Sequence, residues 1–192
     1  MKSVTRAAVL AGLVLGTGLA PIPGAALAQT TSADSPATDS AAGVTVETDA
    51  EFVRLATSSD ILEIRSSEVA QDRAASDAVK GFAARMIADH TAASQALAEA
   101  AGQAAPDFAT NLSAKLDPRH AEQLAMLEAA AAGAGFDQAY VDLQRVAHEE
   151  AVALFQTYAT NGEEGEVKAF AEATVPKLQE HLAMVQDLRV GP

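Results

Sequence analysis

The sequence contains no cysteine. Without cysteine the chain has neither disulfide bonds nor an amino-terminal residue to which a lipid anchor could be attached. Its stability must therefore come from the packing of a core. After a removable amino-terminal segment and the polar stretch that follows it, about 145 residues remain to fold, which suits one domain.

Basic residues are scarce. The chain has 13 Lys and Arg against 26 Asp and Glu, which gives a formal charge of −13 at neutral pH. A surface of this sign repels phosphate backbones and anionic lipid, and no basic stripe offsets it. The composition therefore argues against nucleic acid as a partner.

Long apolar runs are missing after the first twenty residues. The single run, at residues 7–20, follows the basic residues Lys2 and Arg6 and leads to small residues that end at Ala28. This order is typical of a secretory signal peptide. We predict a signal peptide over residues 1–28, cleavage after Ala28, a periplasmic location and no membrane-spanning segment in the mature chain.

The segment that follows the predicted cleavage site is polar. Residues 29–47 are rich in Ser, Thr, Ala, Asp and Pro, and they offer too little apolar surface to offset the entropy of ordering. We predict a disordered linker here and a folded domain over residues 48–190. Removal of residues 1–28 takes away two basic residues and no acidic one, so the formal charge becomes −15.

No segment shows the alternating, β-branched pattern of a strand, whereas apolar residues recur at helical three- and four-residue steps. The sequence therefore predicts an all-α fold. Thr48, Ser76 and Asp137 are predicted amino-terminal caps, and Pro176 predicts a kink in the last helix. The four long helices are expected at residues 49–74, 77–103, 138–160 and 165–189.

A long connection over residues 104–136 separates two pairs of helices. Within it, Asp117 and Pro118 have the residue types of a cap and a first helical position, so we predict a short helix that ends near residues 133–135. Two short-linked helix pairs joined by one long crossover are the ferritin-like form of the four-helix bundle.

Each long helix carries one polar residue on its apolar stripe. At 100° per residue, these side chains point toward the shared core, and each lies roughly twelve to fifteen residues from the start of its helix. They are Glu63, His90, His148 and His181. Three imidazoles and a carboxylate at one depth are candidate ligands for a mononuclear site that holds Fe, Zn, Mn or Cu.

Two acidic neighbours complete the candidate site. Asp89 and Glu149 adjoin two of the histidines and are candidate outer acceptors that orient an imidazole. The alternative is a metal-free polar cluster in which Glu63 pairs with one or more of the histidines. His120, in the first turn of the short helix, is expected to face solvent.

Four segments resemble the domain-of-unknown-function family 4142 (DUF4142): MIADHTAA at 86–93, FDQAYV at 136–141, AHEEAVALFQ at 147–156 and TVPKLQEHLAMVQDL at 174–188. The resemblance covers residues 49–189 and includes Glu63. It implies an exported bacterial protein with a ferritin-like bundle, and it implies no established activity.

The sequence departs from the di-iron pattern of ferritin-like bundles. That pattern needs a Glu on each of two helices and Glu-x-x-His on the other two. Ile87 and Leu178 stand three residues before His90 and His181, and His148 occupies the place where helix 138–160 would carry a Glu. The carboxylates that bridge two metal ions are missing, which disfavours ferroxidase or oxygenase chemistry.

These patterns favour a non-enzymatic, exported bundle protein that acts in the cell envelope, in a stress response or through a protein partner. The alternative is a protein that binds one transition metal ion at the Glu and His layer. Hydrolase chemistry is a distant third because no serine lies in a recognisable triad motif.

Overall fold

The computed structural model describes residue 46, residues 48–102 and residues 116–190. This part of the chain forms helices and no strand, so the predicted all-α fold is confirmed. The predicted signal peptide and almost all of the predicted linker lie outside the described residues. The helices are α1 (Asp49–Arg73), α2 (Asp77–Ala100), α4 (Pro118–Glu128), α5 (Ala134–Asn161) and α6 (Glu166–Asp187).

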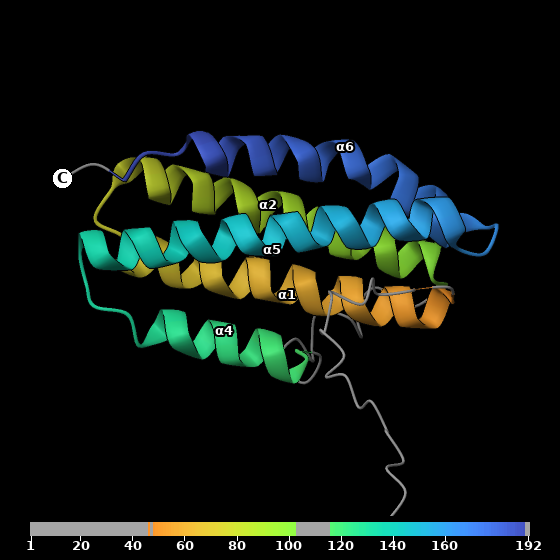
Figure 1. Ribbon diagram of the computed structural model, residues 1–192, viewed down its shortest axis with the longest axis horizontal. Coiled ribbons are helices and arrows are strands. Elements are labelled where there is room, and N and C mark those ends of the chain that lie inside the picture. Colours follow the sequence, from red (N-terminus) through yellow and green to blue (C-terminus); the bar gives the residue numbers. More distant parts are fainter. Residues whose placement is uncertain (1–45, 47, 103–115, 191–192) are drawn as a thin grey trace, which may run out of the picture. The chain divides into compact units, whose positions relative to one another are not determined.

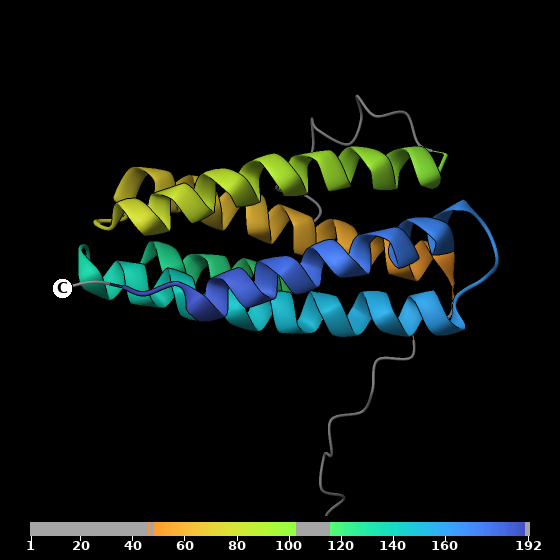
Figure 2. The same cartoon turned by 90° about the horizontal axis from the view of Figure 1, so that it is seen from above.

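The four long helices form a bundle (Figure 1). α1 and α2 make one antiparallel pair, and α5 and α6 make the other. α1 packs against α5 and α2 packs against α6, while α4 lies outside this square against α1 and α5. Figure 2 shows the same pairs from above. Because α4 belongs to the connection between α2 and α5, the predicted crossover with its short helix is confirmed.

The apolar core has two main clusters, one in each half of the bundle, and a small third cluster of Leu62, Leu124 and Ala147 where α4 packs on the bundle. The first contains Phe82, Met86 and Tyr140, together with the ends of α1 and α6. The second contains Phe52 and Tyr158, whose rings stack with their centroids 4.1 Å apart. The predicted layer of Glu and His residues falls between these clusters, so the middle of the bundle is polar while both halves are apolar.

Two predicted helix starts are confirmed. The Thr48 hydroxyl accepts a hydrogen bond from the Glu51 amide at 3.4 Å, and the Asp117 carboxylate accepts one from the His120 amide at 2.9 Å. These contacts satisfy amides that have no partner in the first turn of a helix.

The predicted cap of α5 was wrong. α5 begins at Ala134, after Gly133 with φ 84, so Asp137 lies inside the first turn. Its carboxylate instead accepts hydrogen bonds from the amides of Ala75 and Ser76, both at 2.9 Å. The Ser76 side chain, which we expected to cap α2, makes no capping hydrogen bond. Asp137 therefore holds the turn between α1 and α2 from another helix.

The remaining helix ends differ by a few residues from prediction. α2 ends at Ala100, α4 ends at Glu128, and α6 spans Glu166–Asp187 and continues through Pro176. Among the described helices, none combines the length and hydrophobicity needed to cross a membrane.

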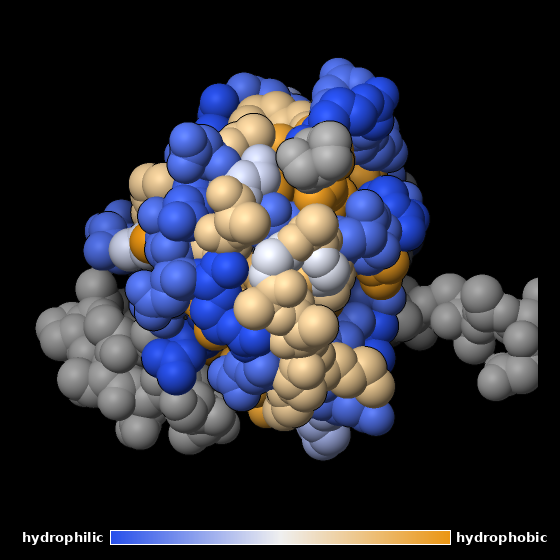
Figure 3. All heavy atoms as spheres, turned by 90° about the vertical axis from the view of Figure 1, so that its left-hand side faces the viewer, coloured by the Kyte–Doolittle hydropathy of each residue, from blue (hydrophilic) through white to orange (hydrophobic). Residues whose placement is uncertain are grey.

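The surface is mixed. At the end of the bundle where α1 meets α2, hydrophilic residues lie beside a band of moderately hydrophobic ones (Figure 3). Among the described residues, the large hydrophobic side chain with high exposure is Met126 on α4, at 63%. The bundle therefore buries its large apolar groups, and the informative features lie inside it.

Candidate metal site in the bundle core

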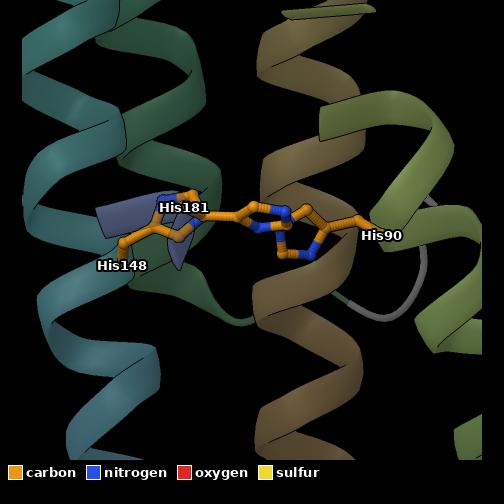
Figure 4. Close-up of side chains that lie close together, drawn as sticks. All are labelled: His90, His148 and His181. Carbon is orange, nitrogen blue, oxygen red and sulfur yellow. The ribbon is translucent and has the colours of Figure 1, made fainter. Parts of the chain in front are cut away.

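Three of the predicted ligands meet at the centre of the bundle. His90 comes from α2, His148 from α5 and His181 from α6, and their relative exposures are 3%, 0% and 1%. The ring centroids are 5.4 to 5.5 Å apart, and one nitrogen of each ring lies within 4.8 Å of the others. Figure 4 shows the three rings pointing toward one another.

Each ring is held from behind by an oxygen atom. Nδ1 of His90 lies 2.9 Å from Asp60 Oδ1, and Nε2 of His181 lies 2.8 Å from Asp89 Oδ2. Nδ1 of His148 lies 2.8 Å from the main-chain oxygen of Gln144. Carbonyl and carboxylate oxygens only accept, so each of these nitrogens carries the proton and donates it.

The opposite nitrogens lack partners. Nε2 of His90, Nε2 of His148 and Nδ1 of His181 are buried, and no described atom hydrogen-bonds to them. In a neutral imidazole whose first nitrogen is protonated, the second presents a lone pair. Three buried lone pairs without a donor are unfavourable in a metal-free protein, and they are the donor set that a transition metal ion requires.

The spacing leaves room for an ion with a modest movement of the rings. Tetrahedral coordination with metal–nitrogen bonds of about 2.0 to 2.1 Å places two ligand nitrogens about 3.3 Å apart. In this structure one nitrogen of each ring lies within 4.8 Å of one nitrogen of each of the other two. Coordination would therefore bring the most widely spaced pair of nitrogens closer by up to about 1.5 Å.

Glu63 lies beside this cluster on α1. Its side chain is 1% exposed, its Oε1 lies 3.5 Å from Nδ1 of His148, and neither carboxylate oxygen has a hydrogen-bond partner among the described residues. The carboxylate faces the nitrogen that His148 uses to bind Gln144, so it does not join the three converging nitrogens. A carboxylate buried without a hydrogen-bond partner is unfavourable, and a cation in this layer would supply the missing partner.

The two acidic residues predicted to support the site lie in different places. Asp89 accepts a hydrogen bond from His181, the contact expected of an outer acceptor. Glu149 is exposed and pairs with Arg145 at 3.4 Å, so it points away from the cluster.

The sequence interpretation missed Asp60. This carboxylate is buried, accepts a hydrogen bond from His90, and accepts a second one from the Ser94 hydroxyl at 3.0 Å. Its position three residues before Glu63 was a usable signal, because residues three apart on a helix share one side. Asp60 was overlooked because it belongs to the polar run Thr57–Asp60, which resembles a segment that faces solvent.

The comparisons with known proteins agree with the resemblance found in the sequence. The family described as "Domain of unknown function (DUF4142)" matches residues 24–188. The chain belongs to this family. No curated protein and no solved structure matches the chain. The family match confirms the membership that the sequence predicted.

Electrostatics distinguish the histidines of this DUF4142 domain. Burial lowers the pKa of His90, but the hydrogen bond to Asp60 and the charge of Glu63 together raise it by more than burial lowers it. The pKa of His90 is therefore above its usual value. Burial lowers the pKa of His181 to about 4, which the contact with Asp89 only partly offsets. His181 is therefore a neutral donor at pH 7, while a proton competes with metal at His90.

His120 does not face solvent, so that prediction was wrong. It is 7% exposed, because α4 packs its inner side against α1. Its Nδ1 lies 2.7 Å from the Ser58 hydroxyl, and Asp117 Oδ2 lies 3.3 Å from the same nitrogen. Burial lowers the pKa of His120.

The cluster of Ser58, His120 and Asp117 does not have the geometry of a catalytic triad. In a triad, serine and aspartate contact opposite nitrogens of the imidazole. Here both contact Nδ1, while Nε2 lies 3.3 Å from the Arg119 guanidinium. Ser58 is also fully buried. This DUF4142 protein uses the cluster to attach α4 to the bundle.

Proposed function

We propose that this DUF4142 protein binds one transition metal ion in the middle of its four-helix bundle, through His90, His148 and His181. The observation that carries the proposal is that each ring donates a hydrogen bond from one N–H to an oxygen and leaves its other nitrogen buried without a partner. This pattern of an oxygen behind each imidazole is typical of metal-bound histidine.

Charge balance also supports a cation. Asp60 and Glu63 are buried carboxylates in this layer, and Asp89 stands at its edge. Buried negative charge is unfavourable unless it is paired, and a divalent ion among three neutral imidazoles would offset it. Neutral imidazole is a ligand for Zn, Fe, Mn and Cu, so these remain the candidate ions.

The arrangement favours one ion over two. Asp60 and Asp89 contact the outer nitrogens of the histidines, and neither belongs to the group of converging ligand atoms. Glu63 is the carboxylate closest to serving as a fourth ligand, after a rotation of its side chain. A bridged pair of ions needs several carboxylates directed inward.

Holding the ion, rather than turning over a substrate, fits the burial of the site. The three histidines are almost completely buried between two apolar clusters. We propose a non-enzymatic role in metal storage or protection, with the ferritin-like arrangement of two helix pairs as the scaffold. The same scaffold could serve a stress response of the cell envelope, alone or with a protein partner.

We propose a periplasmic location on the basis of residues 1–28, which have the basic start, apolar run and small-residue end of a signal peptide. Amino-terminal sequencing of protein recovered from the periplasm is expected to begin at Gln29. Recovery of the uncleaved chain from the cytoplasm would contradict this part of the proposal.

Titration of metal-free protein with Co²⁺, followed by its visible absorption, tests the proposal. We expect saturation at one ion per chain and a loss of affinity of at least about 100-fold in His148→Ala, because a direct ligand matters more than the orienting groups. His120→Ala is the matched control, since it removes the other buried histidine of the chain.

Circular dichroism would confirm that each variant folds. No binding by folded wild-type protein would overturn the proposal, and so would equal binding by wild type and folded His148→Ala. In that case the histidines form the metal-free polar cluster, with protonated His90 paired to Asp60.

A further inference from the structure

We infer that metal enters and leaves the core between α2 and α6, past Asp89 and His181, and that Arg85 controls the rate of this exchange. The inference rests on the proposed metal site and adds how an ion reaches it. It comes from the exposure of the oxygen atoms behind the three histidines and from the contacts of Arg85.

The groups behind His90 and His148 are closed to solvent. Asp60 has a side chain 7% exposed and is also bound by Ser94. The Gln144 oxygen that holds His148 belongs to the main chain of α5 and is buried. α4 further covers α1 and α5 from outside. An ion that came from these sides would have to displace helix backbone.

The group behind His181 is open to solvent. The Asp89 side chain is 31% exposed, yet its Oδ2 lies 2.8 Å from Nε2 of His181, whose own side chain is 2% exposed. Asp89 is thus the point at which the hydrogen bonds of the buried layer reach the surface. A carboxylate in this position is a suitable first ligand for a divalent ion that arrives from water.

Arg85 spans the two helices over this point. Its Nε lies 3.3 Å from Asp89 on α2, and its Nη2 lies 2.6 Å from Glu180 on α6. The guanidinium therefore contacts Oδ2 of Asp89, the same oxygen that accepts from His181, and it adds positive charge in the path of a cation. It also links α2 to α6 next to His181. Its side chain is 40% exposed, so it can turn away without disturbing the core.

The geometry indicates a sequence of events. Arg85 leaves Asp89, and the carboxylate binds the incoming ion. His181 then turns its unpartnered Nδ1 toward the ion and passes the ion to His90 and His148. Afterwards Nε2 of His181 and Arg85 contact Asp89 again. Release follows the same steps in reverse. Removal of Arg85 should therefore accelerate both directions and change the equilibrium affinity little.

The test measures release of Zn²⁺ from loaded protein into an excess of a chromogenic chelator by stopped-flow absorbance. Wild type is compared with Arg85→Ala and with Glu180→Gln, which removes the negative charge that pairs with Arg85 on α6. Arg145→Ala is the matched control. Arg145 also contacts two acidic residues, Asp142 at 3.9 Å and Glu149 at 3.4 Å, and its side chain is 42% exposed, but it lies on α5 away from Asp89.

We expect release to be about threefold to tenfold faster in Arg85→Ala, with a smaller acceleration in Glu180→Gln and no change in Arg145→Ala. Equal rates in wild type and Arg85→Ala, from proteins that each bind one Zn²⁺, would overturn the exchange route and leave the metal site standing. Wild-type protein that holds no Zn²⁺ would overturn both.

Discussion

At the scale of single residues, the core layer combines three histidines with oxygen atoms of different kinds. Asp60, Asp89 and the main chain of Gln144 each fix one ring and one tautomer. Such contacts orient the free lone pairs before an ion arrives, which reduces the entropy lost on binding.

Asp60→Asn tests this orienting role. The amide that replaces the carboxylate is a weaker acceptor and can place an NH₂ group against His90. We expect the affinity for Co²⁺ to fall by about 10- to 100-fold with the stoichiometry unchanged. Ser94→Ala is the control, because it removes the second donor to Asp60 and leaves the His90 contact in place. Equal affinity in wild type and Asp60→Asn would contradict the role of Asp60.

His181 predicts a pH dependence of stability in the metal-free protein. Its folded pKa is about 4 because of burial, below the unfolded value of about 6.5. Between these values the unfolded chain binds more protons, so the free energy of unfolding rises with pH. The gain from His181 is roughly 3 kcal/mol, complete above about pH 6.5 and lost as the pH falls toward 4.

Urea denaturation at several pH values between 4 and 6.5, with a chelator present, measures this effect. His181→Gln should show a shallower rise than wild type over that window. His90 acts in the opposite sense: its raised pKa contributes stability below pH 6.5 that is lost as the pH rises through the folded value. Parallel curves for wild type and His181→Gln would show that His181 is not buried as a neutral group.

At the scale of helices, apolar spacing predicted the long elements, and it placed His90, His148 and His181 at one depth because helical rise and rotation are regular. Helix ends were predicted less well. Asp137 has the sequence signature of a local cap, yet it binds the amides of Ala75 and Ser76 on a distant turn. A capping residue in a sequence does not reveal which helix it serves when tertiary packing supplies the amides.

Asp137→Ala is expected to lower the free energy of unfolding by about 2 kcal/mol, since it leaves two amides at the start of α2 without an acceptor. Urea denaturation of metal-free protein at pH 7 gives the value. Asp142→Ala, an exposed change on the same helix, should stay within about 0.5 kcal/mol of wild type. A similar small effect of Asp137→Ala would contradict its role at the turn between α1 and α2.

α4 explains why His120 was misjudged. The spacing of apolar residues shows which residues share a face of one helix, but it does not show against which other helix that face packs. The place of a short helix within a long connection therefore could not be predicted. α4 packs on the polar run of α1 that contains Ser58 and Ser59, and so buries residues that resemble a solvent face. The polar composition of this run can be read from the sequence, but the packing of α4 over it cannot.

At the scale of the whole molecule, the bundle has two apolar halves and a polar layer between them. Apolar packing in both halves stabilises the fold without disulfides. The layer works against stability when empty, because the buried Glu63 carboxylate and the three imidazole lone pairs lack hydrogen-bond partners. A bound ion would give these groups a partner and would stabilise the layer. The least stable part of the core is therefore also the proposed metal site.

The metal content of the native protein tests this account most directly. Mature, untagged protein would be purified from the periplasm and analysed by elemental mass spectrometry, beside His148→Ala and the control His120→Ala. The account predicts close to one transition metal ion per chain in wild type and in His120→Ala, and none in His148→Ala. A folded wild-type protein without stoichiometric metal, or the same metal content in folded His148→Ala, would contradict it.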